Sequence, residues 1–140
     1  MDTKKQERMF KFLSTMIRRK GLKRIAIGLL PSFNNRYVFV KISDNYDLIK
    51  TELAPLESMD KALERLVRYA FGRTVSFELQ SYMGKIDYST VDSMIRQFNF
   101  EIKLNNMDLL HPNLELFEKE KTNQLPLEKP LSQLLKNLEF

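Results

Sequence analysis

Basic side chains near the start of the chain are the groups best suited to chemistry, because Lys and Arg bind phosphate by releasing its counterions. Of the 23 Lys and Arg residues, nine lie within residues 1–24, beside two acidic residues. This segment therefore carries a net charge of +7, while residues 25–140 carry −2. Thr3 and Gly21 frame a predicted helix over about residues 4–20 that gathers basic side chains on one face and apolar ones on the other.

The basic face predicts a nucleic-acid-binding or regulatory protein whose contacts go to the phosphate backbone of DNA or RNA. The residues predicted to bind nucleic acid are Lys4, Lys5, Arg8, Lys11, Arg18, Arg19, Lys20, Lys23, Arg24 and Arg36. Two other interpretations stay open: a solvated helix face, and docking on an anionic membrane or in the groove of a partner protein.

Aromatic residues next to Arg36 allow a related interpretation. Tyr37 and Phe39 alternate with apolar residues in a predicted strand and lie close to Lys41. Aromatic rings beside cations on a sheet can stack single-stranded nucleic acid. The alternative, which we favour, places both rings in the core under the first helix.

Three residues further along could hold a metal ion. Asp87 lies in one predicted extended segment, and Glu101 and Lys103 lie in a second. An Asp followed by Glu-x-Lys on a neighbouring strand resembles the restriction-endonuclease-like nuclease family. The resemblance implies an Mg²⁺-dependent nuclease in which the carboxylates hold the metal and the Lys positions or activates water. Alternation over residues 100–104 also allows Glu101 and Lys103 to form the solvent side of an edge strand.

Other catalytic signals are scarce. The single histidine, His111, lies in a His-Pro-Asn turn, where we expect a loop residue without a catalytic role. The chain has no cysteine, which excludes disulfides and thiolate chemistry, and its four glycines are not clustered into a phosphate-binding loop. The residues thus favour a binding protein over an enzyme, and no cofactor is predicted.

Apolar periodicity predicts a small single α+β domain over residues 1–105, in which helices cover a four-stranded sheet. The predicted order is αββαβαβ. After the first helix, the strands are expected over residues 24–30, 36–43, 74–80 and 100–104, and the first two form a hairpin whose turn lies over residues 31–35. Residues 43–47 are expected to form a loop, and residues 48–56 are ambiguous. The other helices are expected over residues 59–71, ended by Gly72, and over residues 89–98, where Ser89 and Asp92 resemble a capping box. The predicted buried face of the helix over residues 59–71 is Met59, Ala62, Leu63, Leu66, Val67, Ala70 and Phe71.

The end of the chain has a different character. Residues 106–129 read as an irregular, charged linker region with a short helix over residues 114–121. Residues 130–140 predict a leucine-rich helix that is too short to be stable alone in water. It must dock on its own domain, on a second copy in a homodimer, or on a partner protein, which gives an adaptor or oligomer component as the second functional hypothesis. The residues predicted to make this contact are Leu131, Leu134, Leu135 and Leu138.

Membrane and export signals are not expected. No apolar run approaches the ~20 residues that a membrane-spanning helix needs. The basic start is not followed by the uncharged apolar stretch of a signal peptide. We therefore expect a cytoplasmic protein.

Overall fold

A mixed β-sheet forms the centre of the computed structural model, which describes residues 7–13, 24–107 and 110–136. Its seven strands are β1 Ile25–Phe33, β2 Arg36–Ile42, β3 Asn45–Asp47, β4 Ile49–Glu52, β5 Phe77–Ser89, β6 Met94–Leu104 and β7 Leu114–Glu118. Residues 7–13 are helical. The remaining elements are α2 Met59–Phe71, the short 3₁₀ helix η1 Lys119–Gln124 and α3 Lys129–Lys136. Within these residues, every helix is too short or too polar to cross a lipid bilayer.

The strand order differs from the predicted one. The main path is β3-β2-β1-β6-β5, with β4 paired to β1 and β7 paired to β2. The central strands β1 and β6 run parallel, and the other paired strands run antiparallel. The expectation of a four-stranded sheet covered by helices, in the order αββαβαβ, is therefore wrong, although helices and strands are both present.

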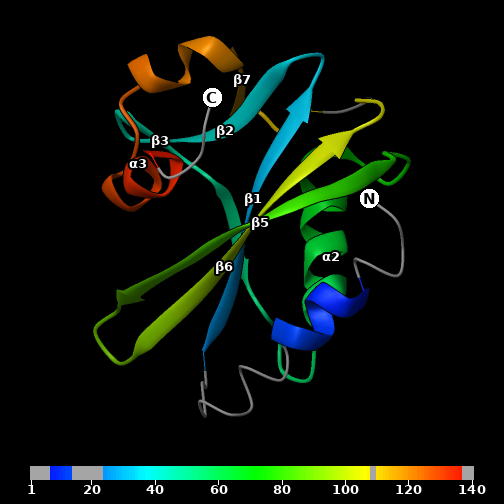
Figure 1. The fold of residues 1–140 in the computed structure, drawn as a ribbon, viewed down its shortest axis with the longest axis vertical. Helices are drawn as coiled ribbons and strands as arrows, with labels where there is room; N and C mark the ends of the chain where they lie inside the picture. The colour runs from blue at the N-terminus through cyan, green and yellow to red at the C-terminus, as the bar shows by residue number, and fades with distance from the viewer. Residues whose placement is uncertain (1–6, 14–23, 108–109, 137–140) are drawn as a thin grey trace.

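Both faces of the sheet are covered (Figure 1). Helix α2 and helical residues 7–13 lie on one face, where Phe10 and Leu13 join the larger apolar cluster. The ring of Phe10 lies 5.6 Å from that of Phe100 on β6. On the other face α3 packs its leucines into a second cluster with Tyr37 and Phe39. The sheet therefore separates two cores.

Helix α2 confirms the predicted helix over residues 59–71. Its buried face is the predicted set: Met59, Ala62, Leu63, Leu66, Val67, Ala70 and Phe71. The helix ends at Gly72, whose φ of 96° suits glycine and whose N–H donates to Arg68 O. Ser58 stands at the N-cap, but its side chain makes no capping hydrogen bond.

The first hairpin is also confirmed, with a tighter turn than expected. Asn34 and Asn35 connect β1 to β2 with φ of 50° and 61°, which is the backbone of a two-residue type I′ turn. Because the turn needs only these two residues, strand β1 continues through Pro31 to Phe33. This proline lies between the part of β1 that pairs with β4 and the part that pairs with β2, so its missing N–H removes no bond on that edge.

The helix expected over residues 89–98 is a β-hairpin. Thr90 and Ser93 form its turn, in which Thr90 N–H donates to Ser93 O at 2.8 Å. The apparent capping box at Ser89 and Asp92 is thus turn chemistry. Strand β6 pairs with β5 on one edge and with β1 on the other, and these two ladders stabilise the extended backbone against the local helical pattern.

Residues 114–121 are likewise not an α-helix. They form β7 and the start of η1, because β7 pairs with β2 from Arg36 to Val40. The predicted loop over residues 43–47 contains β3, and the segment over residues 48–56, which was left ambiguous, contains β4. Segments that were not predicted as strands, namely β3, β4, β7 and the start of β6, therefore complete the sheet.

Candidate ligand-binding site

The sheet splits between β2 and β4, and this split creates the candidate site. Strand β1 pairs with β4 over Ala26–Leu29 and with β2 at Ser32 and Phe33, along the same edge. Strands β2 and β4 are therefore not paired with each other. A cavity opens on each face of the split, and Ile42 of β2 and Lys50 of β4 line both.

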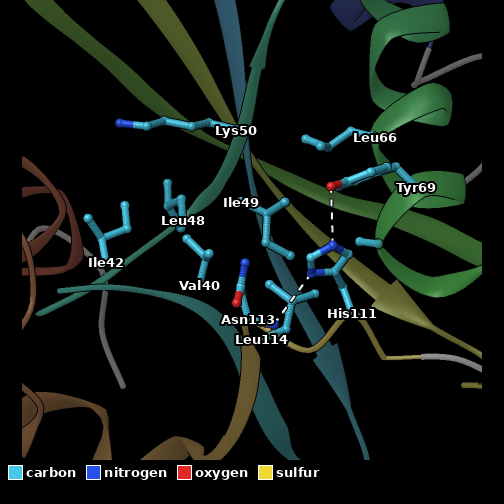
Figure 2. A pocket seen from close by; sticks show the side chains of 11 residues that line it. Val40, Ile42, Leu48, Ile49, Lys50, Leu66, Tyr69, His111, Asn113 and Leu114 are labelled. Atoms are coloured by element: carbon cyan, nitrogen blue, oxygen red, sulfur yellow. Dashed lines mark hydrogen bonds between the residues drawn. The ribbon is translucent and has the colours of Figure 1, made fainter. Parts of the chain in front are cut away.

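The first of these, which we call the apolar cavity, lies between the split and α2 and has a volume of about 270 Å³ (Figure 2). Helix α2 contributes Leu66, Tyr69 and Ala70 to its wall. The other lining residues are Val40, Ile42, Leu48, Ile49, Lys50, His111, Asn113 and Leu114. Lys50 extends away from Tyr69 and His111, so that mainly its aliphatic stem faces this cavity.

Tyr69 and His111 form the polar edge of the apolar cavity. The Tyr69 hydroxyl lies 3.2 Å from His111 Nε2, and the two rings have centroids 5.1 Å apart with their planes tilted by 34°. Asn113 N–H donates to His111 Nδ1 at 3.4 Å, so a neutral imidazole carries its proton on Nε2 and donates to the tyrosine oxygen. The backbone N–H of His111 donates to Ala70 O, which ties this loop to the end of α2.

The second cavity, which we call the polar cavity, lies on the opposite face and has a volume of about 350 Å³. Its lining residues are Ile42, Asp47, Lys50, Ile86, Tyr88, Gln97, Glu128 and Pro130. Asp47 is only 8% exposed. Its Oδ1 accepts from Leu48 N–H at 2.8 Å, and its Oδ2 lies 3.2 Å from the Lys50 ammonium. That ammonium also lies over the Tyr88 ring, 5.3 Å from its centroid.

A ladder of two buried amides lies beside the polar cavity, and Gln97 is the one that lines it. Gln97 and Asn99 are 3% and 0% exposed, and Gln97 Nε2 donates to Asn99 Oδ1 at 2.6 Å. Asn99 Nδ2 donates to Gly84 O and to Gln97 O, which fixes the orientation of both amides. Gly28 of β1 lies directly beneath them, since a Cβ there would come within 2.3 Å of Asn99 Oδ1. The ladder is thus possible only beside a residue without a side chain.

An ion pair fixes the loop between β4 and α2. Both carboxylate oxygens of Glu57 accept from Arg65, each at 2.9 Å, and one also accepts from Ala54 N–H. Arg65 donates further to Thr51 Oγ1 and Glu52 O. The bidentate bond to Arg65, followed by the Ala54 N–H, lowers the pKa of Glu57 to about 2. This contact holds α2 in position against the split.

The basic residues predicted to bind nucleic acid do not form a described site. Lys4, Lys5, Arg18, Arg19, Lys20 and Lys23 lie outside the described residues. Arg8 and Lys11 are exposed in the N-terminal helical segment, and Arg36 is exposed at the start of β2. Arg24 instead donates to Glu52, Thr90 and Ser93, which ties β4 to the β5–β6 turn.

The three residues of the predicted metal site are not brought together. Asp87 is held by Arg96, whose Nε and Nη2 donate to its two oxygens at 2.7 and 2.9 Å. Glu101 and Lys103 lie further along β6 and line a different cavity near the β1–β2 turn. The residues that the structure describes contain no group of three or more His, Cys, Asp or Glu side chains that could hold a metal ion.

The aromatic and leucine residues singled out in the sequence are in the core. Tyr37 and Phe39 are 5% and 0% exposed, so they cannot stack nucleic acid, and they pack under α3 rather than under the N-terminal helix. Leu131, Leu134 and Leu135 are buried in the same cluster, against the chain's own sheet. Leu138 lies outside the described residues.

Sequence reasoning missed both amides of the ladder and the residues that line the polar cavity. Gln97 and Asn99 were assigned to a helix and to the residues just after it, which hid their position on one face of β6. The alternation of Gln97 and Asn99 with Phe98 and Phe100 was the available signal for an extended strand with a polar stripe. Asp47 and Tyr88 gave no local signal.

Comparison with known proteins identifies the fold. No family model matches the sequence, and no curated protein is detectably related to it in sequence. Solved structures do match. A MutT NUDIX hydrolase from Burkholderia pseudomallei aligns with a TM-score of 0.64 at 14% identity, covering 83% of this chain and 98% of that one. The chain has the fold of the NUDIX hydrolases.

Two further structures agree. The C. elegans Ap4A hydrolase aligns with a TM-score of 0.61 at 17% identity, covering 80% of this chain and 92% of that one. The E. coli dihydroneopterin triphosphate pyrophosphohydrolase gives 0.60 at 9% identity, with 81% and 93% covered. At such identities the likeness establishes the fold alone.

This fold corrects the functional predictions. The nucleic-acid-binding or regulatory protein, the adaptor and the restriction-endonuclease-like nuclease are all set aside, because the structural neighbours are NUDIX hydrolases. The first prediction depended on the charge of residues 1–24, and the described part of this segment, residues 7–13 and Arg24, contributes no strand to the sheet. The surface charge of a segment carries no information about the core beneath it.

The residues that line the apolar cavity do not fit a magnesium centre of the kind that phosphate hydrolysis uses, since none of them is acidic. Mg²⁺ binds carboxylate oxygens together with substrate phosphates. The three α2 residues that face the apolar cavity, Leu66, Tyr69 and Ala70, offer no carboxylate. The acidic residues of α2, Asp60 and Glu64, are exposed and do not line this cavity.

Proposed function

We propose that this chain is a cytoplasmic small-molecule-binding protein that holds a phosphorylated heterocycle at the split between β2 and β4 without Mg²⁺-dependent hydrolysis. The observation that carries the proposal is the wall that α2 presents to the apolar cavity. This wall consists of Leu66, Tyr69 and Ala70. A hydrophobic wall can bind a ligand, but it cannot hold the divalent cation that neutralises a transferring phosphoryl group.

The class of ligand is supported by the neighbours and by the split itself. The names of two neighbours, an Ap4A hydrolase and a dihydroneopterin triphosphate pyrophosphohydrolase, refer to heterocycles that carry phosphates. In this chain the polar cavity offers the Tyr88 ring and several polar groups, which suit a planar heterocycle. Lys50 borders both cavities and supplies a charged donor that can bind a phosphate or a carbonyl oxygen of such a ligand.

Calorimetry with nucleoside mono-, di- and triphosphates, with and without Mg²⁺, tests the proposal. We expect binding that stabilises the fold, by about 2.7 kcal/mol at a ligand concentration 100 times Kd. Phosphate release should stay at the level of a no-protein control in the presence of Mg²⁺. The Lys50→Gln variant should bind about tenfold more weakly, since it loses a charge-assisted contact.

Lys61→Gln is the matched control, because Lys61 is an exposed residue of α2 outside both cavities. Thermal unfolding of each variant without ligand separates lost binding from lost stability, since Lys50 also pairs with Asp47. If no phosphorylated heterocycle binds, the proposed ligand class is wrong. Mg²⁺-dependent phosphate release by the wild type that exceeds the release in every contaminant control would instead refute the part of the proposal that excludes hydrolysis.

A further inference from the structure

The polar cavity has an unusual concentration of hydrogen-bonding groups beside the apolar core. Asp47 and Gln97 are two of the five buried polar residues of the described chain, and both line it. Burying such groups is unfavourable unless they are hydrogen-bonded. Their hydrogen bonds are made within the protein, yet both residues line the cavity and keep unused acceptor capacity. The unused acceptors determine which edge of a ligand can bind in this cavity.

We propose, building on the function proposed above, that the polar cavity recognises the amino-oxo-pyrimidine edge that guanine and pterins share. On this edge an exocyclic amino group, a ring N–H and a carbonyl oxygen lie side by side. It thus presents two adjacent donors and one acceptor. The cavity presents the complementary pattern.

Asp47 supplies the acceptors for the two adjacent donors. Each of its oxygens has one partner in the protein, Leu48 N–H for Oδ1 and the Lys50 ammonium for Oδ2. An ionised carboxylate has about four acceptor sites, so one on each oxygen is still available. A carboxylate that meets an amino group and a ring N–H forms two parallel bonds, which is the geometry that discriminates best between bases.

Lys50 supplies the donor for the carbonyl. Its ammonium has three N–H groups and pairs with Asp47. The same ammonium lies over the Tyr88 ring, which holds it in the cavity beside the carboxylate. The Tyr88 ring also gives a planar ligand an aromatic surface to stack on.

Gln97 adds a further acceptor whose orientation is fixed. Asn99 Nδ2 donates to two carbonyl oxygens, so the Asn99 side-chain oxygen is the atom that faces Gln97. Gln97 therefore donates to it through Nε2. In the described part of the chain Gln97 Oε1 has no hydrogen bond, and Gln97 lines the cavity. Acceptors therefore outnumber donors here, which disfavours adenine, whose edge offers a single amino donor beside an acceptor nitrogen.

Binding of four ligands to the wild type tests this inference: GTP, ITP, ATP and neopterin. ITP differs from GTP by the missing amino group. Neopterin carries the same edge as guanine but no phosphate. We expect GTP to bind about tenfold or more tightly than ITP, because loss of the amino group leaves a buried acceptor unpaired. ATP should bind at least as weakly as ITP.

Variants assign the preference to the cavity. Asp47→Asn should bring the GTP-to-ITP affinity ratio close to one, whereas Asp44→Asn, an exposed position in the β2–β3 turn, should leave it unchanged. Because Asp47 also accepts from Leu48 N–H, its variant could be unstable, so Tyr88→Leu provides a second readout. That variant should weaken all purine ligands together and keep the GTP-to-ITP ratio.

The outcomes separate the two proposals. Equal affinities for GTP, ITP and ATP would overturn the inference and leave the proposed function standing. No binding by any of the phosphorylated ligands would remove the proposed function itself. Neopterin binding as tight as that of GTP would support recognition of this edge and identify a pterin-type ligand. Much weaker neopterin binding, with GTP preferred over ITP, would support a guanine nucleotide.

Discussion

Replacing Glu57 by Gln tests whether the ion pair that fixes the loop before α2 stabilises the fold. The substitution keeps the shape of the side chain and removes its charge. Glu57 accepts three hydrogen bonds, two from Arg65 and one from Ala54 N–H. Its side chain is 15% exposed, whereas that of Arg65 is 46% exposed, so solvent weakens the pair.

The expected loss of folding free energy therefore lies between that of a hydrogen bond to a charged group and that of an exposed ion pair. Hydrogen bonds to charged groups contribute about 1.5–3 kcal/mol and exposed ion pairs about 0–1 kcal/mol, which places Glu57→Gln at about 1–2 kcal/mol. For a domain of this size the loss corresponds to a fall in Tm of roughly 3–10 °C. Urea unfolding at neutral pH measures it. Glu64→Gln is the control, because Glu64 is exposed and pairs with Arg68 at 3.6 Å, and it should change stability by less than about 0.5 kcal/mol.

The pH dependence gives a sharper test. Arg65 lowers the pKa of Glu57 in the folded protein to about 2, from an ordinary value of 4.5. The unfolded chain thus takes up the proton at higher pH, and the stabilisation is complete above 4.5 and is lost as pH falls towards 2. The gap between wild type and Glu57→Gln should shrink over this range. Comparison with the variant is needed because Arg24 lowers the pKa of Glu52 too. A gap that stays constant with pH, or a loss no larger than that of Glu64→Gln, would refute the reasoning.

Two further substitutions test backbone and packing. Gly28→Ala should destabilise the fold by about 1–3 kcal/mol, because the new Cβ would meet Asn99 Oδ1 at 2.3 Å and Gln97 Nε2 at 2.6 Å. Denaturant unfolding measures this loss, and an unchanged midpoint would show that the amides can move aside. Leu56→Gly should leave the fold unchanged or stabilise it by up to about 1 kcal/mol, since Leu56 is fully exposed and its φ of 65° is unfavourable for leucine. A lower Tm for this variant would contradict that interpretation.

Local patterns in the sequence were sufficient for the elements that depend on them. Helix α2 was predicted with its full buried face, because its apolar residues repeat at helical spacing and Gly72 ends it. The β1–β2 hairpin was predicted from two apolar runs around Asn34 and Asn35, whose turn chemistry acts over two residues. In both cases the determining interactions lie within one element or one turn.

Composition alone misdirected the functional prediction. The concentration of charge in residues 1–24 is a property of the sequence that carries no information about the fold, and it led to the prediction of a nucleic-acid-binding protein. The predicted helix over residues 89–98 had the same weakness, because Ser89 and Asp92 resemble a cap whether or not a helix follows. In the structure, pairing with β1 and β5 outweighs that local preference.

The tertiary structure alone decided the sheet and the site. The parallel pairing of β1 with β6 joins segments about 70 residues apart, as in Ile25 with Arg96, and no local pattern encodes it. The split between β2 and β4 follows from two strands sharing one edge of β1. That arrangement brings Asp47, Lys50, Tyr88 and Gln97 into one cavity. Each of these residues is unremarkable in its own segment, and only long-range strand pairing turns them into a complementary set of donors and acceptors.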